Sequence, residues 1–193
     1  MKRSLFIMVF GLMAMSFAFP SHAQRLIPRQ KGIEVMGSLP ICKEAKLFTS
    51  RHFGAGISLT QYLKRENYVF LGMEYEQQTI PYRTYTVPLQ DALLQVGYMH
   101  PFLSDRGKNI FGYLGISALG GYEEVNEAKQ LLPDGATLLD RSRFVYGGSL
   151  HSSAECLLTD YLLLILRVQG RFLFGSDIHL FRPSVSMGIR FNL

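Results

Sequence analysis

Hydrophobic and polar residues alternate along most of the chain, in segments of roughly ten residues separated by turn-forming residues. Alternation with a period of two places apolar side chains on one face of a strand and polar or small side chains on the other. Regular segments of this kind predict an all-β barrel or sandwich. The predicted strands cover residues 32–39, 51–62, 68–78, 89–102, 110–122, 144–157, 161–174 and 184–193.

The polar faces help to separate a membrane barrel from a soluble one. In segment 161–174 leucine, valine and phenylalanine occupy one face, and Arg167, Gln169 and Arg171 occupy the other. Such side chains are poorly suited to the dry interior of a lipocalin-like barrel, but they suit the polar lumen of a small membrane barrel. Segment 110–122 is apolar or small on both faces, so its orientation stays open. Glycine and serine make segment 144–157 the least regular.

The lengths of the connections provide a second line of evidence. Short connections at 63–67, 103–109 and 158–160 alternate strictly with longer ones at 40–50, 79–88, 123–142 and 175–183. Outer-membrane barrels have short turns on the periplasmic side and longer loops outside. We therefore predict an eight-stranded antiparallel up-and-down β-barrel of outer-membrane type, with both chain ends in the periplasm.

The N-terminal residues have the pattern of a secretory signal peptide. Lys2 and Arg3 precede an apolar stretch from Leu5 to Phe19, and small residues at Ser21 and Ala23 mark a cleavage site. The alternative is an uncleaved anchor, but the stretch of about 15 apolar residues is shorter than the roughly 20 that a spanning helix needs. We predict a signal peptide over 1–23, cleaved near Ala23, and a single barrel domain over 24–193, located in the outer membrane.

Charge and cysteine content narrow the classes of function. The formal net charge is +5, and no clustered basic footprint of the kind that binds nucleic acid appears. The chain has two cysteines. The predicted topology places Cys42 in the first external loop and Cys156 at the periplasmic end of segment 144–157, about 30 Å apart along a strand. A disulfide needs Cα atoms within about 7 Å, so we predict no bridge.

Charged residues on the polar faces are the main candidates for a functional site. If the apolar faces contact lipid, the inward residues are Glu74, Glu76, Asp91, Arg167, Arg171 and Arg190. They form either an ion path or ligand site, or a set of paired side chains that fills the lumen. The filled lumen is the favoured interpretation, because an eight-stranded barrel is only just wide enough for its own side chains.

Catalysis is a weaker alternative. His151, Ser152, Ser153 and Glu155 supply the residue types of a nucleophile, a base and an orienting group. Neighbouring residues on a strand point to opposite faces, however. His151 and Ser153 therefore share one face, and Ser152 lies on the other. The chain has no G-x-S-x-G motif, and the three other histidines beyond the predicted signal peptide, at 52, 100 and 179, show no metal-ligand spacing. We expect no catalytic, cofactor-binding or metal-binding residues, and no cofactor.

Two further segments suggest contacts with other proteins. Residues 186–193 look like the terminal β-signal that the barrel-assembly machinery recognises, although a terminal aromatic is commoner than Leu193. The 123–142 connection and the 79–88 connection, with Tyr82 and Tyr85, are either partner-contact surfaces or simple solvated loops, since loops on rigid scaffolds often carry function.

Residues 24–35, 94–98 and 112–115 are similar to TraO-type conjugal transfer proteins from conjugative transposons of Bacteroides-like bacteria. The resemblance implies an envelope component of a type IV-like DNA transfer apparatus. It implies no catalytic residues. The expected partners are membrane lipid and other envelope components of that apparatus, with no direct nucleic acid contact. The alternatives are a general surface barrel for adhesion or envelope integrity and an outer-membrane lipid-modifying enzyme.

Overall fold

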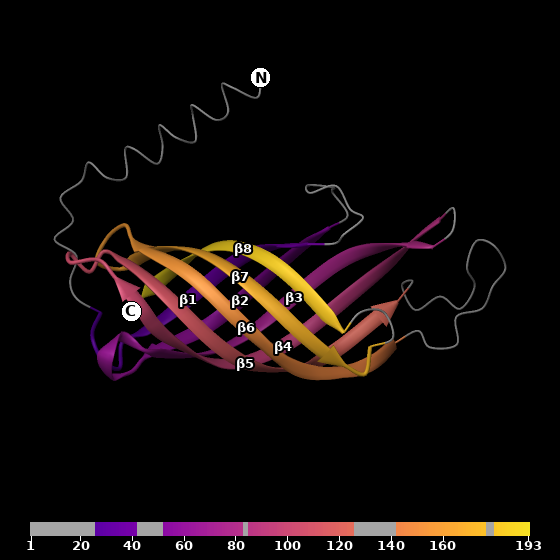
Figure 1. Ribbon diagram of the computed structural model, residues 1–193, viewed down its shortest axis with the longest axis horizontal. Helices are drawn as coiled ribbons and strands as arrows, with labels where there is room; N and C mark the ends of the chain where they lie inside the picture. Colours follow the sequence, from indigo (N-terminus) through magenta and orange to yellow (C-terminus); the bar gives the residue numbers. More distant parts are fainter. Residues whose placement is uncertain (1–25, 42–51, 83–84, 126–141, 177–179) are drawn as a thin grey trace, which may run out of the picture.

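The computed structural model describes residues 26–41, 52–82, 85–125, 142–176 and 180–193. Each strand pairs antiparallel with the next, and β8 pairs with β1, so the sheet closes into a barrel (Figure 1). The predicted eight-stranded up-and-down barrel is thereby confirmed, and the predicted signal peptide lies outside the described residues. The strands are β1 Lys31–Pro40, β2 Phe53–Tyr62, β3 Tyr68–Tyr82, β4 Tyr85–Ser104, β5 Ile110–Val125, β6 Ser142–Leu157, β7 Leu162–Phe174 and β8 Phe181–Asn192; a 3-10 turn, η1 Lys64–Glu66, joins β2 to β3.

The two ends of the barrel differ. The turn end holds the three short connections β2–β3, β4–β5 and β6–β7 together with the C-terminus, whereas the loop end holds the other connections (Figure 1). Backbone hydrogen bonds close the short turns, such as Leu63 N to Asn67 O at 2.7 Å and Asp105 N to Ile110 O at 3.0 Å. The connections fall at the two ends as predicted, but the strict alternation of short and long does not hold, because only residues 83–84 lie between β3 and β4.

The prediction of a loop over 79–88 is wrong. β3 and β4 continue as a hairpin as far as the pair Tyr82 and Tyr85, with Thr79 opposite Pro88 and Pro81 opposite Thr86. The two prolines led to the interpretation of a loop, because proline cannot donate to a sheet ladder. Leu89 is the first residue of β4 with a described partner in β5, so Pro88 lies in the part of the hairpin that pairs with β3 alone, where a proline is tolerated as on an edge strand.

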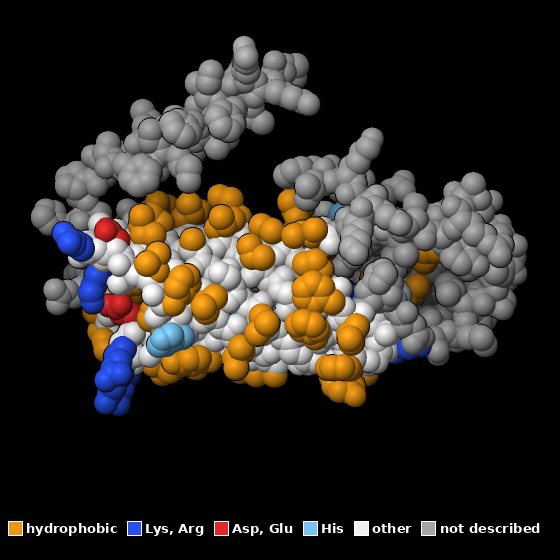
Figure 2. All heavy atoms as spheres, in the orientation of Figure 1, with side chains coloured by type: hydrophobic (Ala, Val, Ile, Leu, Met, Phe, Trp, Pro, Cys, Tyr) orange, Lys and Arg blue, Asp and Glu red, His pale blue; other side chains and the backbone are white. Residues whose placement is uncertain are grey.

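The outer surface of the barrel is apolar across its middle. Side chains such as Ile57, Leu71, Met73, Ile116 and Met187 are each more than half exposed. Figure 2 shows hydrophobic side chains spread over the strands, with most of the visible lysine, arginine and acidic side chains at the turn end. The surface has the pattern of a barrel that contacts hydrocarbon. No helix among the described residues is long and apolar enough to cross a membrane.

The structure settles the orientation of the two ambiguous strands. On β5 the side chains of Phe111, Tyr113 and Ser117 are buried in the lumen, whereas Leu114 and Ile116 face outward. On β6 the buried face carries Ser149, His151, Ser153 and Glu155. Because β6 pairs without interruption with both neighbours, its glycines and serines do not disturb the sheet.

Apolar side chains fill the lumen at the turn end. We call this cluster the plug. Its Phe70 ring lies against the backbone of Gly97, where an added Cβ would come within 2.5 Å of the ring, so glycine is needed for this close approach. A smaller cluster of Leu93, Leu119, Val145 and Leu173 lies on the other half. The plug consists of Tyr62, Tyr68, Phe70, Met99, Phe111, Tyr113, Leu157 and Leu163.

Candidate functional site

The charged side chains of the lumen form three ion clusters along the barrel axis. All six predicted lumen charges are buried, which confirms their predicted orientation. The alternation that turns apolar side chains toward the outside turns these charges inward, where each must find a partner. The turn-side ion cluster contains Glu34, Glu155, Arg167 and Arg190; the central ion cluster contains Glu74, Glu76 and Arg171; the loop-side ion cluster contains Asp91, Glu123 and Arg182.

The turn-side ion cluster is densely bonded. Arg190 of β8 contacts Glu34 of β1 at 2.6 Å and Glu155 of β6 at 2.7 Å. Arg167 of β7 contacts the other oxygen of Glu34 at 2.9 Å. The Tyr68 hydroxyl donates to Glu155 at 2.5 Å, and the Arg190 guanidinium lies 4.2 Å from the centre of the Tyr68 ring. Two carboxylates therefore meet two guanidinium groups, packed against the plug.

The central ion cluster crosses the barrel from one wall to the opposite wall. Arg171 of β7 forms a close ion pair with Glu76 of β3. Its NH1 nitrogen lies 3.8 Å from Oε2 of Glu74, which is too long for a hydrogen bond. Gln78 donates to the other oxygen of Glu76. One guanidinium thus faces two carboxylates, and it bonds closely to only one of them.

The loop-side ion cluster, near the loop end of the barrel, also has one guanidinium group for two carboxylates. Arg182 of β8 contacts Asp91 of β4 at 2.6 Å and Glu123 of β5 at 2.5 Å. Ser176 donates to Glu123 at 2.9 Å. The described lumen therefore carries six buried carboxylates against four buried guanidinium groups, and the excess lies in the central and loop-side clusters.

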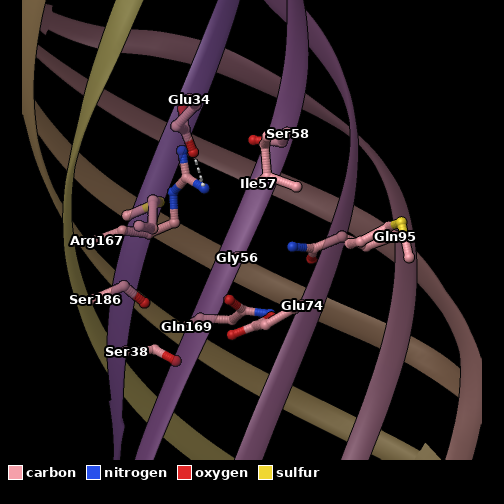
Figure 3. Close-up of a pocket in the computed structure, with 12 residues that line it drawn as sticks. Glu34, Ser38, Gly56, Ile57, Ser58, Glu74, Gln95, Arg167, Gln169 and Ser186 are labelled. Atoms are coloured by element: carbon pink, nitrogen blue, oxygen red, sulfur yellow. Dashed lines mark ion pairs between the residues drawn. The ribbon is translucent and has the colours of Figure 1, made fainter.

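A polar cavity lies beside the central ion cluster. It is small, with a volume of about 20 Å³, and it is partly open to solvent. Gly56 of β2 lies opposite Glu74, and the absence of a side chain there leaves room (Figure 3). Several buried polar atoms have no hydrogen-bond partner among the described residues and belong to residues that line this cavity: Ser38 Oγ, Glu74 Oε2, Gln95 Oε1, Arg167 Nε and Gln169 Nε2.

The residues of the hydrolase alternative do not assemble into a catalytic arrangement. His151 Nε2 lies 2.7 Å from Ser149 Oγ and 3.0 Å from Ser117 Oγ. Ser153 donates to Glu155 at 3.4 Å and forms no hydrogen bond with His151 among those described. Ser152 faces outward, as the alternation predicts. His151 therefore belongs to a small hydrogen-bonded cluster of serines inside the barrel.

The described part of the chain contains no conventional metal centre built from ionisable side chains. There, no group of three or more His, Cys, Asp or Glu side chains is arranged to hold a metal ion. Cys156 has a free thiol near the turn end of β6. Cys42 lies outside the described residues, although β1 ends next to it at the loop end, so the absence of a bridge stays a prediction.

Sequence reasoning missed four of the buried charges. Glu34 alternates with Ile33 and Val35, and Glu155 lies on the same face as Ser153, so the period of two was sufficient to find both. Glu123 and Arg182 lie just beyond the predicted ends of their strands at Tyr122 and Ser184. Strand boundaries are uncertain by a few residues, so these two were counted with the loops.

A family model described as "Conjugative transposon protein TraO" matches residues 27–193. No curated protein matches the chain. Among solved structures, Neisserial surface protein A (NspA) is similar with a TM-score of 0.57 and 10% identity, over 85% of this chain and 96% of that one. The attachment invasion locus protein Ail of Yersinia pestis is similar with a TM-score of 0.55 and 8% identity, over 86% of this chain and 100% of that one.

The N-terminal β-barrel domain of Pseudomonas aeruginosa OprF is also similar, with a TM-score of 0.50 and 11% identity, over 86% of this chain and 98% of that one. At such low identities the likeness concerns the fold alone. It shows that the closed barrel is of the outer-membrane type.

Proposed function

Because the chain belongs to the TraO family of conjugative transposon proteins, we propose that it is a non-enzymatic outer-membrane component of a conjugative DNA transfer apparatus. It serves that apparatus as an accessory of the mating pore or of the envelope around it. The observation that carries the proposal is the family match over 27–193, which includes every strand of the barrel.

The surface of the barrel supports a location in the outer membrane. Large apolar side chains face outward on all eight strands, and every strand is hydrogen-bonded to two neighbours. A closed barrel is the form in which strands can cross hydrocarbon without unpaired backbone groups. In this proposal residues 1–23 direct export and are removed, and the turn end faces the periplasm.

The interior supports an accessory role rather than a conduit for DNA. The plug and the three ion clusters occupy the lumen with side chains of their own. An eight-stranded barrel has no space for a DNA strand once its interior side chains are in place. Membrane lipid and other envelope components are therefore the proposed partners, without direct nucleic acid contact.

The turn end is the described surface best suited to contact periplasmic components. Basic side chains gather there, beyond the apolar surface of the strands (Figure 2). The exposed basic residues of this end are Arg29, Lys31, Lys64, Arg65 and Arg106. The exposed acidic residues Asp105 and Asp160 lie in the turns of the same end, so the surface presents charges of both signs, and such charges orient a partner of complementary pattern. The predicted contact surface at 123–142 lies almost wholly outside the described residues.

Cell fractionation combined with a transfer assay tests the proposal. We expect the protein in the outer-membrane fraction, with folded and heated forms that migrate differently on gels. Deletion of its gene should lower the transfer frequency of the element that encodes it, and expression from a plasmid should restore it. A plasmid copy without residues 2–23 is the matched control and should not restore transfer.

The two halves of the proposal fail separately. Undiminished transfer after deletion would remove the role in conjugation and leave a general surface barrel. Recovery in the soluble or inner-membrane fraction would remove the outer-membrane location. The non-enzymatic part is tested with His151→Ala and Ser153→Ala, which should leave both transfer and the lipid profile of the host unchanged.

A further inference from the structure

The carboxylate of Glu74 is the most poorly paired charge of the central ion cluster. Glu74 is only 8% exposed, and its Oε2 atom has no hydrogen-bond partner among the described residues. Arg171 lies 3.8 Å away and bonds closely to Glu76 instead. A buried charge without a close partner is costly, because the lumen supplies less compensation than bulk water. The charge of Glu74 is therefore only partly compensated.

Neutral oxygen atoms around the same cavity also lack partners. The Gln95 amide oxygen and the Ser38 hydroxyl belong to residues that are 8% and 5% exposed. The Gln95 oxygen has no hydrogen-bond partner among the described residues, and the Ser38 hydroxyl has only a weak, long contact with the Glu74 carboxylate. Both residues line the cavity together with Glu74, and Figure 3 shows them around one opening in the lumen. A proton bound to Glu74 would satisfy at most one of these acceptors.

We propose that this cavity binds a small, hard metal cation, with Glu74 as the charged ligand and Gln95 and Ser38 as neutral oxygen ligands. Carboxylate, amide and hydroxyl oxygens are the ligands that such cations prefer, and water on the side of the cavity that is open to solvent completes the shell. Na⁺ and Ca²⁺ share this chemistry. With one ionised ligand the affinity is expected to be low, in the range of about millimolar.

The other charges that face the cavity do not prevent this binding. Arg167 is paired with Glu34 at 2.9 Å, and Arg171 is paired with Glu76. These two pairs cancel, so that one negative charge, on Glu74, stays only partly compensated at the cavity. The proposed site also differs from a conventional metal centre, because two of its three protein ligands are uncharged.

Calorimetric titration of the purified, folded full-length barrel with CaCl₂ or with NaCl, in a choline chloride buffer of constant ionic strength, tests the proposal. We expect saturable binding of at least one of the two cations, and the two titrations identify which. Glu74→Gln should abolish the binding, and Gln95→Leu should weaken it by about tenfold. Glu66→Gln is the matched control, because Glu66 pairs with Lys108 at the turn end, outside the cavity.

Two outcomes would overturn the proposal. One is the absence of saturable binding of either cation to the wild-type barrel, which would leave a cavity filled with water. The other is unchanged binding in both Glu74→Gln and Gln95→Leu, which would place the cation elsewhere. Gln95→Leu leaves the charge of the lumen unchanged, so it decides the question even if Glu74→Gln does not fold. Neither outcome bears on conjugation.

Discussion

The turn-side and central ion clusters have the same kinds of residue but a different balance. On the turn side two carboxylates share two guanidinium groups, and tyrosine hydroxyls complete the hydrogen bonding. In the centre one guanidinium faces two carboxylates, beside a polar cavity instead of the aromatic plug. The difference indicates that the turn side is organised for stability, whereas the centre keeps capacity for a ligand.

Removal of the guanidinium at the centre of the turn-side cluster should have the largest effect. Arg190→Met leaves Glu34 and Glu155 buried with one remaining cation, Arg167, and should lower the free energy of unfolding by about 3–5 kcal/mol. Urea unfolding in lipid vesicles, followed by circular dichroism because the chain has no tryptophan, measures this. Arg106→Met, at an exposed turn position, is the control and should have little effect.

Truncation of the plug should have the next largest effect. Phe70→Ala removes a buried ring and leaves a cavity against Gly97, so the free energy of unfolding should fall by about 3 kcal/mol. The same urea titration measures it. An effect below that of a surface substitution such as Phe102→Ala would show that the plug does not stabilise the turn end.

A single hydroxyl tests the hydrogen bonding within the turn-side cluster. Tyr68→Phe keeps the ring against Arg190 but removes the donor to Glu155, leaving that carboxylate less well bonded. We expect a loss of about 1–2 kcal/mol in the free energy of unfolding. Combination with Glu155→Gln should give less than the sum of the two single losses, since both act on one hydrogen bond. Additive losses would contradict the direct bond.

Neutralisation of the central cluster should have the smallest effect on stability. Glu74→Gln removes a charge with no close partner. In the absence of metal cations it should therefore change the free energy of unfolding by less than about 1 kcal/mol, and any change should be an increase. Glu155→Gln, measured in parallel, should be clearly destabilising. Equal losses for the two variants would remove the distinction between the clusters.

The fold followed from the sequence because the barrel repeats one simple rule. Outward apolar and inward polar side chains alternate on every strand, so segments such as 161–174 and 184–193 showed both the strand and its orientation. The rule fails only where both faces are alike, as on β5, where Tyr113 and Leu114 are both large. There the neighbouring strands, and not the local sequence, decide which side chain enters the lumen.

The pairing of the charges could not be predicted in the same way. Arg171 reaches Glu76 from the opposite wall, and that contact depends on the tilt and register of all the strands between them. Alternation places a residue inside the barrel but does not give its height along the axis. The imbalance of the central cluster, and with it the cavity, therefore required the three-dimensional structure.

The pairing of β1 with β8 has a consequence for how the protein is made. Glu34 and Arg190 lie opposite each other in that pairing, and 156 residues separate them along the chain. Contacts of such long range form late and slowly, because the ends of a long chain must meet before any bond repays the lost entropy. Until β8 pairs with β1, the carboxylate of Glu34 lacks its ion pair with Arg190. The last strand therefore both completes the cylinder and brings two of the four buried guanidinium groups, those of Arg182 and Arg190, to the carboxylates that the earlier strands carry.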